Sequence, residues 1–296
     1  MGRAGATPIS ENGGSMRIDR IVKIAAAMAG SLWLTAAGAQ SVALVTDVSG
    51  RVTGPAVITI LSEVPADARL TLDAGARLVA VYLKSGDEYT LSGPAQVQFR
   101  AGEPQVIQGA RAVRKPNPLG KGGDVKIRPV GVTQAAYVMR SGRATARIKL
   151  LALSGTRTLE PSPEFRWRGV DAAARYRVEV TDETGRSLFE TEVEGTSLRL
   201  PDGVRLREGA SYTWEVSTRS ADNRRYVSAG DFSLASADLR TQVETLRPSA
   251  DSPVSQRVAF ASWLEDMQLR DEARRYWRAL SEERPDDSRL KALAAD

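Results

Sequence analysis

Three carboxylates, Asp73, Asp87 and Glu88, lie beside predicted turns and are the first candidates for chemistry. Grouped carboxylate oxygens bind calcium, and paired carboxylates can act as a general acid and a general base. The sequence lacks the D-x-[DN]-x-[DN]-G spacing of a calcium-binding loop, however. We therefore favour turn-forming, solvated carboxylates, with a calcium or acid–base cluster as the alternative.

The composition argues against most kinds of catalytic and metal site. The chain has 296 residues and contains no cysteine and no histidine. Without cysteine there are no disulfides, thiolate nucleophiles or cysteine metal sites, and without histidine the commonest general base and transition-metal ligand are missing. Gly120-Lys121 does not match a phosphate-binding loop, because a glycine follows the lysine and the upstream glycine spacing fails. We expect no enzymatic activity, no cofactor and no metal.

Residues 111–157 form a basic strip, with eleven Lys and Arg residues against one acid, Asp124. Such a strip can bind lipid head groups, lipopolysaccharide or cell-wall carboxylates. A solvated linker balanced by acidic neighbouring domains is the alternative. The net charge of the whole chain, +5, does not indicate nucleic-acid binding. The candidate polyanion-binding residues are Lys121, Lys126, Arg128, Arg140, Arg143, Arg147 and Lys149.

Residues 1–39 are expected to be an N-terminal extension followed by a signal peptide. Three basic residues after Met16, itself a second possible start, precede an apolar run over residues 24–34. The run is short for a membrane-spanning helix, which needs ~20 apolar residues. Ala37-Gly38-Ala39 supplies the small residues of a cleavage site, so we expect a mature start near Gln40 and a periplasmic location. An uncleaved anchor is the alternative.

Residues 41–114 alternate apolar and polar side chains in short runs separated by glycine and proline, as half-buried strands joined by turns do. We expect a hairpin over residues 42–52 with its turn at 47–50, a strand over 57–61, and a strand pair over 96–108. Six or seven such strands predict a small β-sandwich or roll.

Three motifs in this stretch resemble the periplasmic FecR-type domain: Gly75-Ala76-Arg77-Leu78, Tyr82-Leu83-Lys84-Ser85-Gly86 and Leu91-Ser92-Gly93-Pro94. The resemblance covers residues 40–114 and implies a β fold. In FecR proteins this domain is the periplasmic half of a signal transducer, preceded by a transmembrane helix and a cytosolic anti-sigma segment. Here a leader precedes the domain, so the resemblance does not imply sigma-factor regulation.

Residues 115–160 are expected to be a basic linker, extended at first and then carrying short strands over 134–138 and 144–153. Residues 161–235 resemble a fibronectin type III or immunoglobulin-like sandwich, on Phe165-x-Trp167 and on Tyr212-Thr213-Trp214-Glu215-Val216.

The resemblance to such a sandwich implies a tyrosine corner, in which the Tyr212 hydroxyl bonds back to the preceding loop. It also implies that Trp167, Tyr176, Trp214 and Phe232 are core residues. An exposed aromatic platform that stacks on carbohydrate is the alternative.

Residues 236–296 predict helices over 238–247, 256–267 and 272–283, the last capped by Asp271, and a short helix that ends at 295. Seven of these residues fall at a spacing that resembles one tetratricopeptide repeat. They are Phe260, Ala261, Leu264, Ala273, Trp277, Leu280 and Pro285.

About three stacked repeats are needed for an independent solenoid. This pair of helices must therefore dock on its own β domain, on a partner or on a second copy. Phe260, Leu264, Trp277 and Leu280 are candidate partner-binding residues of an exposed apolar groove. A packed helical cap is the alternative.

The sequence thus predicts a mainly β chain with a small α C-terminus, divided at residues 1–39, 40–114, 115–160, 161–235 and 236–296. We expect a non-enzymatic periplasmic scaffold or interaction protein, an accessory of sensing or assembly at the bacterial cell envelope. Its expected partners are envelope proteins, periplasmic or of the inner or outer membrane, with peptidoglycan or another polyanion as a further candidate. Nucleic acid is not expected, and contact with a membrane is peripheral at most. The alternative is a cell-wall or glycan-binding protein that uses the basic strip and exposed aromatic residues.

Overall fold

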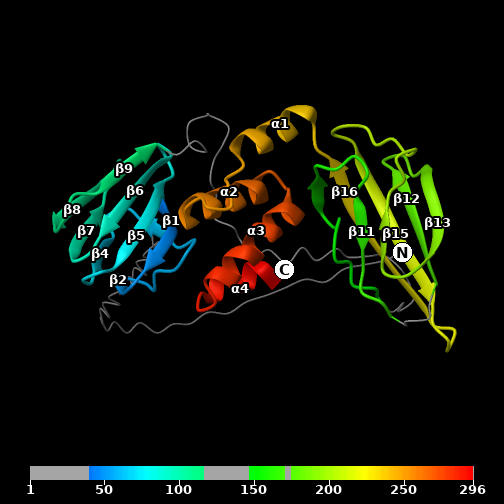
Figure 1. Ribbon diagram of the computed structural model, residues 1–296, viewed down its shortest axis with the longest axis horizontal. Helices are drawn as coiled ribbons and strands as arrows, with labels where there is room; N and C mark the ends of the chain where they lie inside the picture. Colours follow the sequence, from blue (N-terminus) through cyan, green and yellow to red (C-terminus); the bar gives the residue numbers. More distant parts are fainter. Residues whose placement is uncertain (1–39, 117–146, 171–174, 296) are drawn as a thin grey trace, which may run out of the picture. The chain divides into compact units, whose positions relative to one another are not determined.

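The computed structural model describes residues 40–116, 147–170 and 175–295. Over these residues the chain is mainly β, with sixteen strands, and its four helices lie between residues 237 and 295 (Figure 1). This confirms the expected fold class, a mainly β chain with a small helical C-terminus. None of the helices in the described residues is long and apolar enough to cross a membrane.

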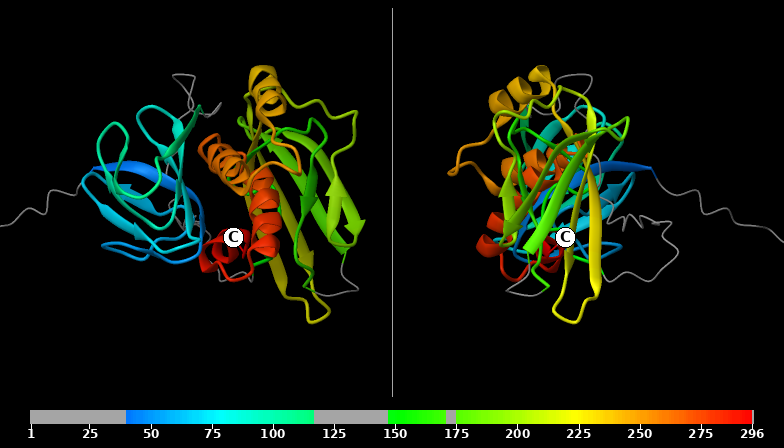
Figure 2. Two further views of the ribbon diagram at one scale, coloured as in Figure 1. Left: turned by 60° about the vertical axis from the view of Figure 1, so that its left-hand side comes forward. Right: turned by 90° about the vertical axis from the view of Figure 1, so that its right-hand side faces the viewer.

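Residues 41–116 form two antiparallel sheets, which we name the first sandwich (Figure 2). One sheet has the order β3-β1-β5-β6-β9 and the other β2-β4-β7-β8. Both supply side chains to one core, where the rings of Tyr82 and Phe99 stack with centroids 6.0 Å apart. The strands are β1 (Ser41–Ser49), β2 (Val52–Thr53), β3 (Glu63–Pro65), β4 (Arg69–Leu72), β5 (Arg77–Tyr82), β6 (Asp87–Ser92), β7 (Ala95–Phe99), β8 (Pro104–Gln108) and β9 (Val113–Pro116).

Two predictions about the first sandwich are wrong. The expected hairpin over 42–52 is absent, because β1 continues past Asp47, with a register shift between Val45 and Asp47, and pairs with β3 and β5. The strand β2 pairs with β4 in the other sheet. The expected strand over 57–61 is an irregular segment that turns at Leu61, where φ is 63°. The predicted pair over 96–108 is confirmed as β7 and β8.

The strand β5 is buried on both faces, although its sequence was expected to alternate. After exposed Arg77, every residue from 78 to 82 is buried. Leu78 and Ala80 face the core of the first sandwich, whereas Val81 packs in a different apolar cluster with the C-terminal helices. The second face of the sheet is therefore covered by protein instead of water.

Residues 148–170 and 175–234 form a second sandwich with a sheet of order β10-β16-β15-β12-β13 and a two-stranded sheet β11-β14. Phe165, Trp167, Tyr176, Trp214 and Phe232 are all at most 3% exposed. This confirms the predicted aromatic core and excludes the stacking platform for these rings. The strands are β10 (Thr156–Thr158), β11 (Glu164–Arg166), β12 (Arg175–Asp182), β13 (Ser187–Glu194), β14 (Ser197–Arg199), β15 (Ser211–Arg219) and β16 (Arg225–Leu234).

The tyrosine corner is present in this sandwich. The Tyr212 hydroxyl accepts a hydrogen bond from the Arg207 backbone N–H at 2.6 Å. Buried polar groups need such partners, and this bond holds the loop that precedes β15.

The end of the predicted linker belongs to the second sandwich. Ile148, Ala152 and Leu153 are buried in its core, and β10 pairs in parallel with β16. The Leu153 carbonyl also accepts a hydrogen bond from the buried Trp214 Nε1 at 2.7 Å. The expected strand over 134–138 lies outside the described residues, as do residues 144–146 of the expected strand over 144–153. Within the described residues 147–153, an isolated bridge from Leu150 to Trp167 is formed in place of a strand.

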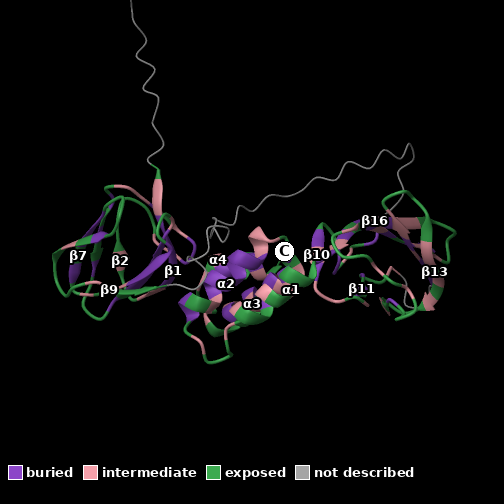
Figure 3. Cartoon of the chain, turned by 90° about the horizontal axis from the view of Figure 1, so that it is seen from above, coloured by how far each residue is buried: buried purple, intermediate pink, exposed green. Residues whose placement is uncertain are grey.

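The helices α1 (Ala237–Leu246), α2 (Val254–Asp266), α3 (Arg270–Glu283) and α4 (Ser288–Ala295) make up the helical segment, residues 237–295. Ala261 and Ala273 are 0% exposed, as expected where two helices approach closely. Figure 3 shows buried residues along α2. The four candidate partner-binding residues are not an open groove, because each is at most 1% exposed: Phe260, Leu264, Trp277 and Leu280.

Gly93, at the end of β6, lies where no larger residue fits. A Cβ atom there would be 1.9 Å from the Asp73 carbonyl oxygen, whereas a Cβ at Gly102 would meet nothing within 4 Å. We expect Gly93→Ala to lower the free energy of unfolding by about 1–3 kcal/mol, the usual cost of overpacking. Gly102→Ala should change it by less than about 0.5 kcal/mol. Urea denaturation of both variants checks this, and equal stabilities would contradict the close approach.

Candidate functional site

The helical segment shares its apolar core with both sandwiches. Leu44 of β1 and Val81 of β5 belong to the same buried cluster as the helices. Ala235, which directly follows the last strand of the second sandwich, belongs to it too, and Leu159 of that sandwich packs against it. The contacts on the two sides of the helical segment are therefore the places where a site could be built between modules.

At the first junction, between the helical segment and the first sandwich, one buried carboxylate accepts hydrogen bonds from two guanidinium groups. Asp47 of β1 accepts hydrogen bonds from Arg77 of β5 at 3.0 Å and from Arg284 at the end of α3 at 3.2 Å. The Asp47 side chain is 5% exposed, whereas the arginines are 45% and 33% exposed. A buried carboxylate needs such partners, so the helix end and the sheet are joined through this group.

Glu88, on β6, is a second buried carboxyl group at this junction. Burial raises the pKa of Glu88, against a hydrogen bond with Ser255 of α2 and the charges of Lys115 and Arg77, which lower it. The junction therefore includes a carboxyl group that the folded chain holds in its protonated form more readily than the unfolded chain does.

The three carboxylates that opened the sequence analysis lie in different surroundings. Asp87 and Glu88 are each 7% exposed, so the prediction of solvated turn carboxylates is wrong for both. Asp87 instead accepts a hydrogen bond from Arg114 at 2.7 Å, while Asp73 is exposed as predicted. No group of metal-ligating side chains is present in the described ranges.

At the second junction, between the helical segment and the second sandwich, a side chain of β10 forms hydrogen bonds with backbone groups at the start of α3. The Thr156 hydroxyl accepts from the Arg270 N–H at 3.0 Å and donates to the Gln268 carbonyl at 3.1 Å. The N-cap residue, Leu269, supplies no side-chain hydrogen bond. A threonine from another module therefore takes the place of a local cap.

The predicted capping role of Asp271 is wrong. Asp271 lies within the first turn of α3, where its carboxylate accepts from the Leu153 backbone N–H at 2.8 Å and from Arg274 at 2.8 Å. The carboxylate thus binds a buried loop of the second sandwich to the helix and also suits the positive end of the helix dipole.

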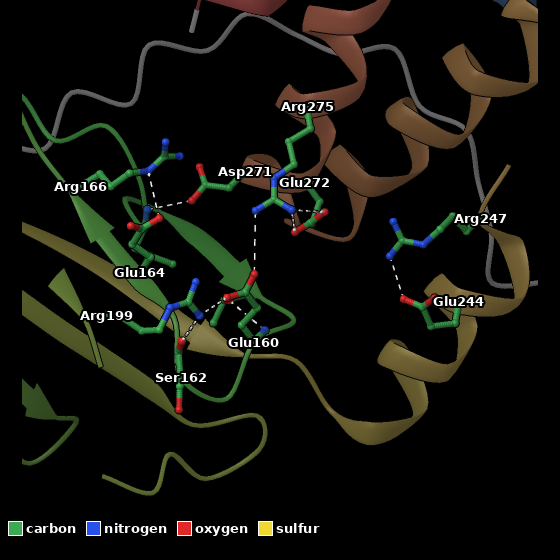
Figure 4. A network of polar contacts seen from close by, with 12 residues as sticks. Glu160, Ser162, Glu164, Arg166, Arg199, Glu244, Arg247, Asp271, Glu272 and Arg275 are labelled. Atoms are coloured by element: carbon green, nitrogen blue, oxygen red, sulfur yellow. Dashed lines mark hydrogen bonds and ion pairs between the residues drawn. The ribbon is translucent and has the colours of Figure 1, made fainter. Parts of the chain in front are cut away.

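Beside this junction lies a cavity of about 260 Å³, which we name the arginine-rich cleft. It is lined by six arginines and four acids, which gives the lining a formal charge of +2. Figure 4 shows Arg166, Glu164 and Glu160 facing Asp271, Glu272 and Arg275. The lining residues are Ala152, Leu153, Arg157, Thr158, Glu160, Pro163, Glu164, Arg166, Arg199, Asp271, Glu272, Arg274, Arg275 and Arg278.

The arginines of the cleft are paired unequally. Arg199 is 3.1 Å from Glu160 and Arg274 is 2.8 Å from Asp271. Arg275 is 3.2 Å from Glu272 but 3.9 Å from Glu160, and Arg166 is 3.9 Å from Glu164. Burial raises the pKa of Glu272, against the charge of Arg275.

Arg157 and Arg278 have no ion pair or side-chain hydrogen bond with any part of the chain that the structure describes. They are the two cleft arginines whose guanidinium donors are open. Surface ion pairs contribute little energy, so the looser pairs of the cleft can also be exchanged for other anions.

Most of the predicted polyanion-binding residues cannot be placed. Lys121, Lys126, Arg128, Arg140 and Arg143 lie outside the described residues, whereas Arg147 and Lys149 are exposed and do not line the cleft.

Among the described residues of the basic strip, Arg157 lines the cleft. The other cleft arginines were missed, although Arg274 and Arg278 are four residues apart and therefore lie on one face of α3.

No family model and no curated protein matches this chain. Among solved structures, CopC from Methylosinus trichosporium OB3b is similar with a TM-score of 0.23 and 19% identity, over 30% of this chain and 93% of that chain. A β-glucuronidase of Parabacteroides merdae has a TM-score of 0.21 and 16% identity, over 29% of this chain and 13% of that chain. PorZ of Porphyromonas gingivalis, a surface component of the type-IX secretion system, has a TM-score of 0.21 and 14% identity, over 53% of this chain and 21% of that chain.

These TM-scores are too low to support an argument about fold or function. The chain also spans only a small share of the β-glucuronidase and of PorZ. The resemblances to FecR, fibronectin type III and tetratricopeptide domains stay predictions.

The raised pKa of Glu88 makes stability depend on pH. A group with a raised pKa in the folded state contributes stability that is fully present below its unfolded pKa, about 4.3 for Glu. That contribution is lost as the pH rises through the folded pKa. The glutamine of the Glu88→Gln variant cannot ionise, so the variant does not lose stability in this way. Its free energy of unfolding minus that of the wild type should therefore increase from pH 4 towards neutrality. Urea denaturation across this range measures the difference.

The matched control is Glu63→Gln, because Glu63 is exposed on β3. Its stability relative to the wild type should change little over the same range. A difference for Glu88→Gln that is constant with pH would contradict the burial of an ionisable group at the first junction.

Proposed function

We propose that this chain is a non-enzymatic scaffold of the bacterial periplasm, which holds envelope proteins on the surfaces of its sandwiches and helical segment. The observation that supports this most is the apolar core that the helical segment shares with Leu44 and Val81 on one side and with Ala235 on the other. Modules joined by a shared core present their surfaces in a fixed relation, which lowers the ordering cost of binding several partners at once.

The expected partners are periplasmic proteins or the periplasmic parts of inner- or outer-membrane proteins. Since Phe260, Leu264, Trp277 and Leu280 are buried, the partner surface of this proposal is the outer face of the modules. Exposed apolar side chains on those faces are few; Val57 is 85% and Leu151 is 39% exposed.

A cell-wall or glycan-binding protein is the second candidate. Exposed Arg147 and Lys149 and the positive lining of the arginine-rich cleft favour it. The version that uses exposed aromatic residues loses its main support, since the five rings named for the core are buried. Cell-wall binding through charge alone should weaken steeply with salt.

Photocrosslinking in living cells tests the scaffold. A photoreactive residue at Val57 in the first sandwich, or at Leu151 in the second, should give discrete adducts with envelope proteins. The matched control is Val97, which is 0% exposed in the core and should give none. If neither surface position gives a protein adduct, and the purified chain instead sediments with peptidoglycan in a salt-sensitive way, the scaffold proposal fails in favour of the second candidate.

The periplasmic location has its own test. Mass spectrometry of the chain recovered from the periplasmic fraction should find an N-terminus at or near Gln40. A chain that stays in the cytoplasm with its leader intact would contradict both the export and the partners proposed here.

A further inference from the structure

The arginine-rich cleft has open hydrogen-bond donors on both of its walls. Arg157, on β10, and Arg278, on α3, line the cavity without an acidic partner in the described residues. Arg166, on β11, adds a further donor, because its pair with Glu164 is 3.9 Å long, near the outer limit of an ion pair, whereas Arg275 is held by Glu272 at 3.2 Å.

The residues that line the cleft have a net positive charge. Its six arginines exceed its four acids by two. Three of the acids already have close arginine partners, Glu160 with Arg199, Asp271 with Arg274 and Glu272 with Arg275. A ligand with two negative charges would neutralise the remainder, whereas a cation would be repelled.

We propose that the arginine-rich cleft binds a phosphoryl group. A tetrahedral phosphate has two negative charges and oxygens directed to several sides, which suits guanidinium donors that come both from the second sandwich and from α3. A single carboxylate has one charge and two oxygens in a plane, so it would leave one wall unsatisfied. This proposal goes beyond the scaffold and does not rest on it.

The size and lining of the cleft limit what the phosphoryl group can be attached to. The volume of about 260 Å³ is below the usual range for drug-sized ligands, so a small phosphate or phosphorylated head group fits better than a nucleotide. None of the lining residues is aromatic, so a base would have no ring on which to stack. Free phosphate and a phosphate head group remain two sources of the same chemistry.

The test uses the mature chain and two probes. Isothermal titration with inorganic phosphate measures binding of the free anion. Flotation with phosphatidylcholine vesicles that contain phosphatidic acid measures binding of a phosphomonoester head group. We expect saturable binding in at least one arm, and the arm that binds identifies the source.

The informative variant is Arg157→Gln together with Arg278→Gln. Both arginines are without ion pairs in the described chain, so the variant should keep its melting temperature within a few degrees while its affinity falls at least about tenfold. The matched control is Arg168→Gln, an exposed arginine of the second sandwich that does not line the cleft, and it should bind as the wild type does. Absence of binding in both arms, or equal affinity of the double variant and the wild type, would overturn the proposal.

Discussion

The burial of the helical segment against both sandwiches is the interaction on which the rest of the structure depends. One helical pair exposes too much apolar surface to be stable in water by itself, and most helical stability in proteins comes from packing. Here Trp263, Trp277 and their neighbours are covered by the chain's own strands, among them β1 and β5. The tetratricopeptide-like spacing is thus completed by β modules instead of by further repeats.

Polar contacts set how the helices lie in this core. Asp47 fixes the end of α3 through Arg284, while Thr156 and Asp271 fix its beginning. Each contact satisfies a group that would be costly to leave unpaired, so slipping the helix by one turn would break all of them. The arginine-rich cleft is a consequence of this placement, since α3 brings Arg274, Arg275 and Arg278 beside β10 and β11.

The elements that were predicted well are those in which local pattern and environment agree. β12 and β15 alternate between core and solvent, and the sequence shows that alternation. Prediction failed where the cause is distant in the chain. Asp47 was expected in a turn over residues 47–50, yet it is buried in β1, where Arg77 and Arg284 are its partners. The cleft was missed for the same reason, because its arginines come from four separate segments.

Native-state hydrogen exchange tests the shared core most directly. If the helical segment and the first sandwich share a core, the amides of β1 and α2 should open together, with the same free energy and the same dependence on urea. The same result should hold for α3 and β10. If α2 and α3 instead exchange at low free energy while β1 stays protected, the helices are loosely attached and the central claim is contradicted.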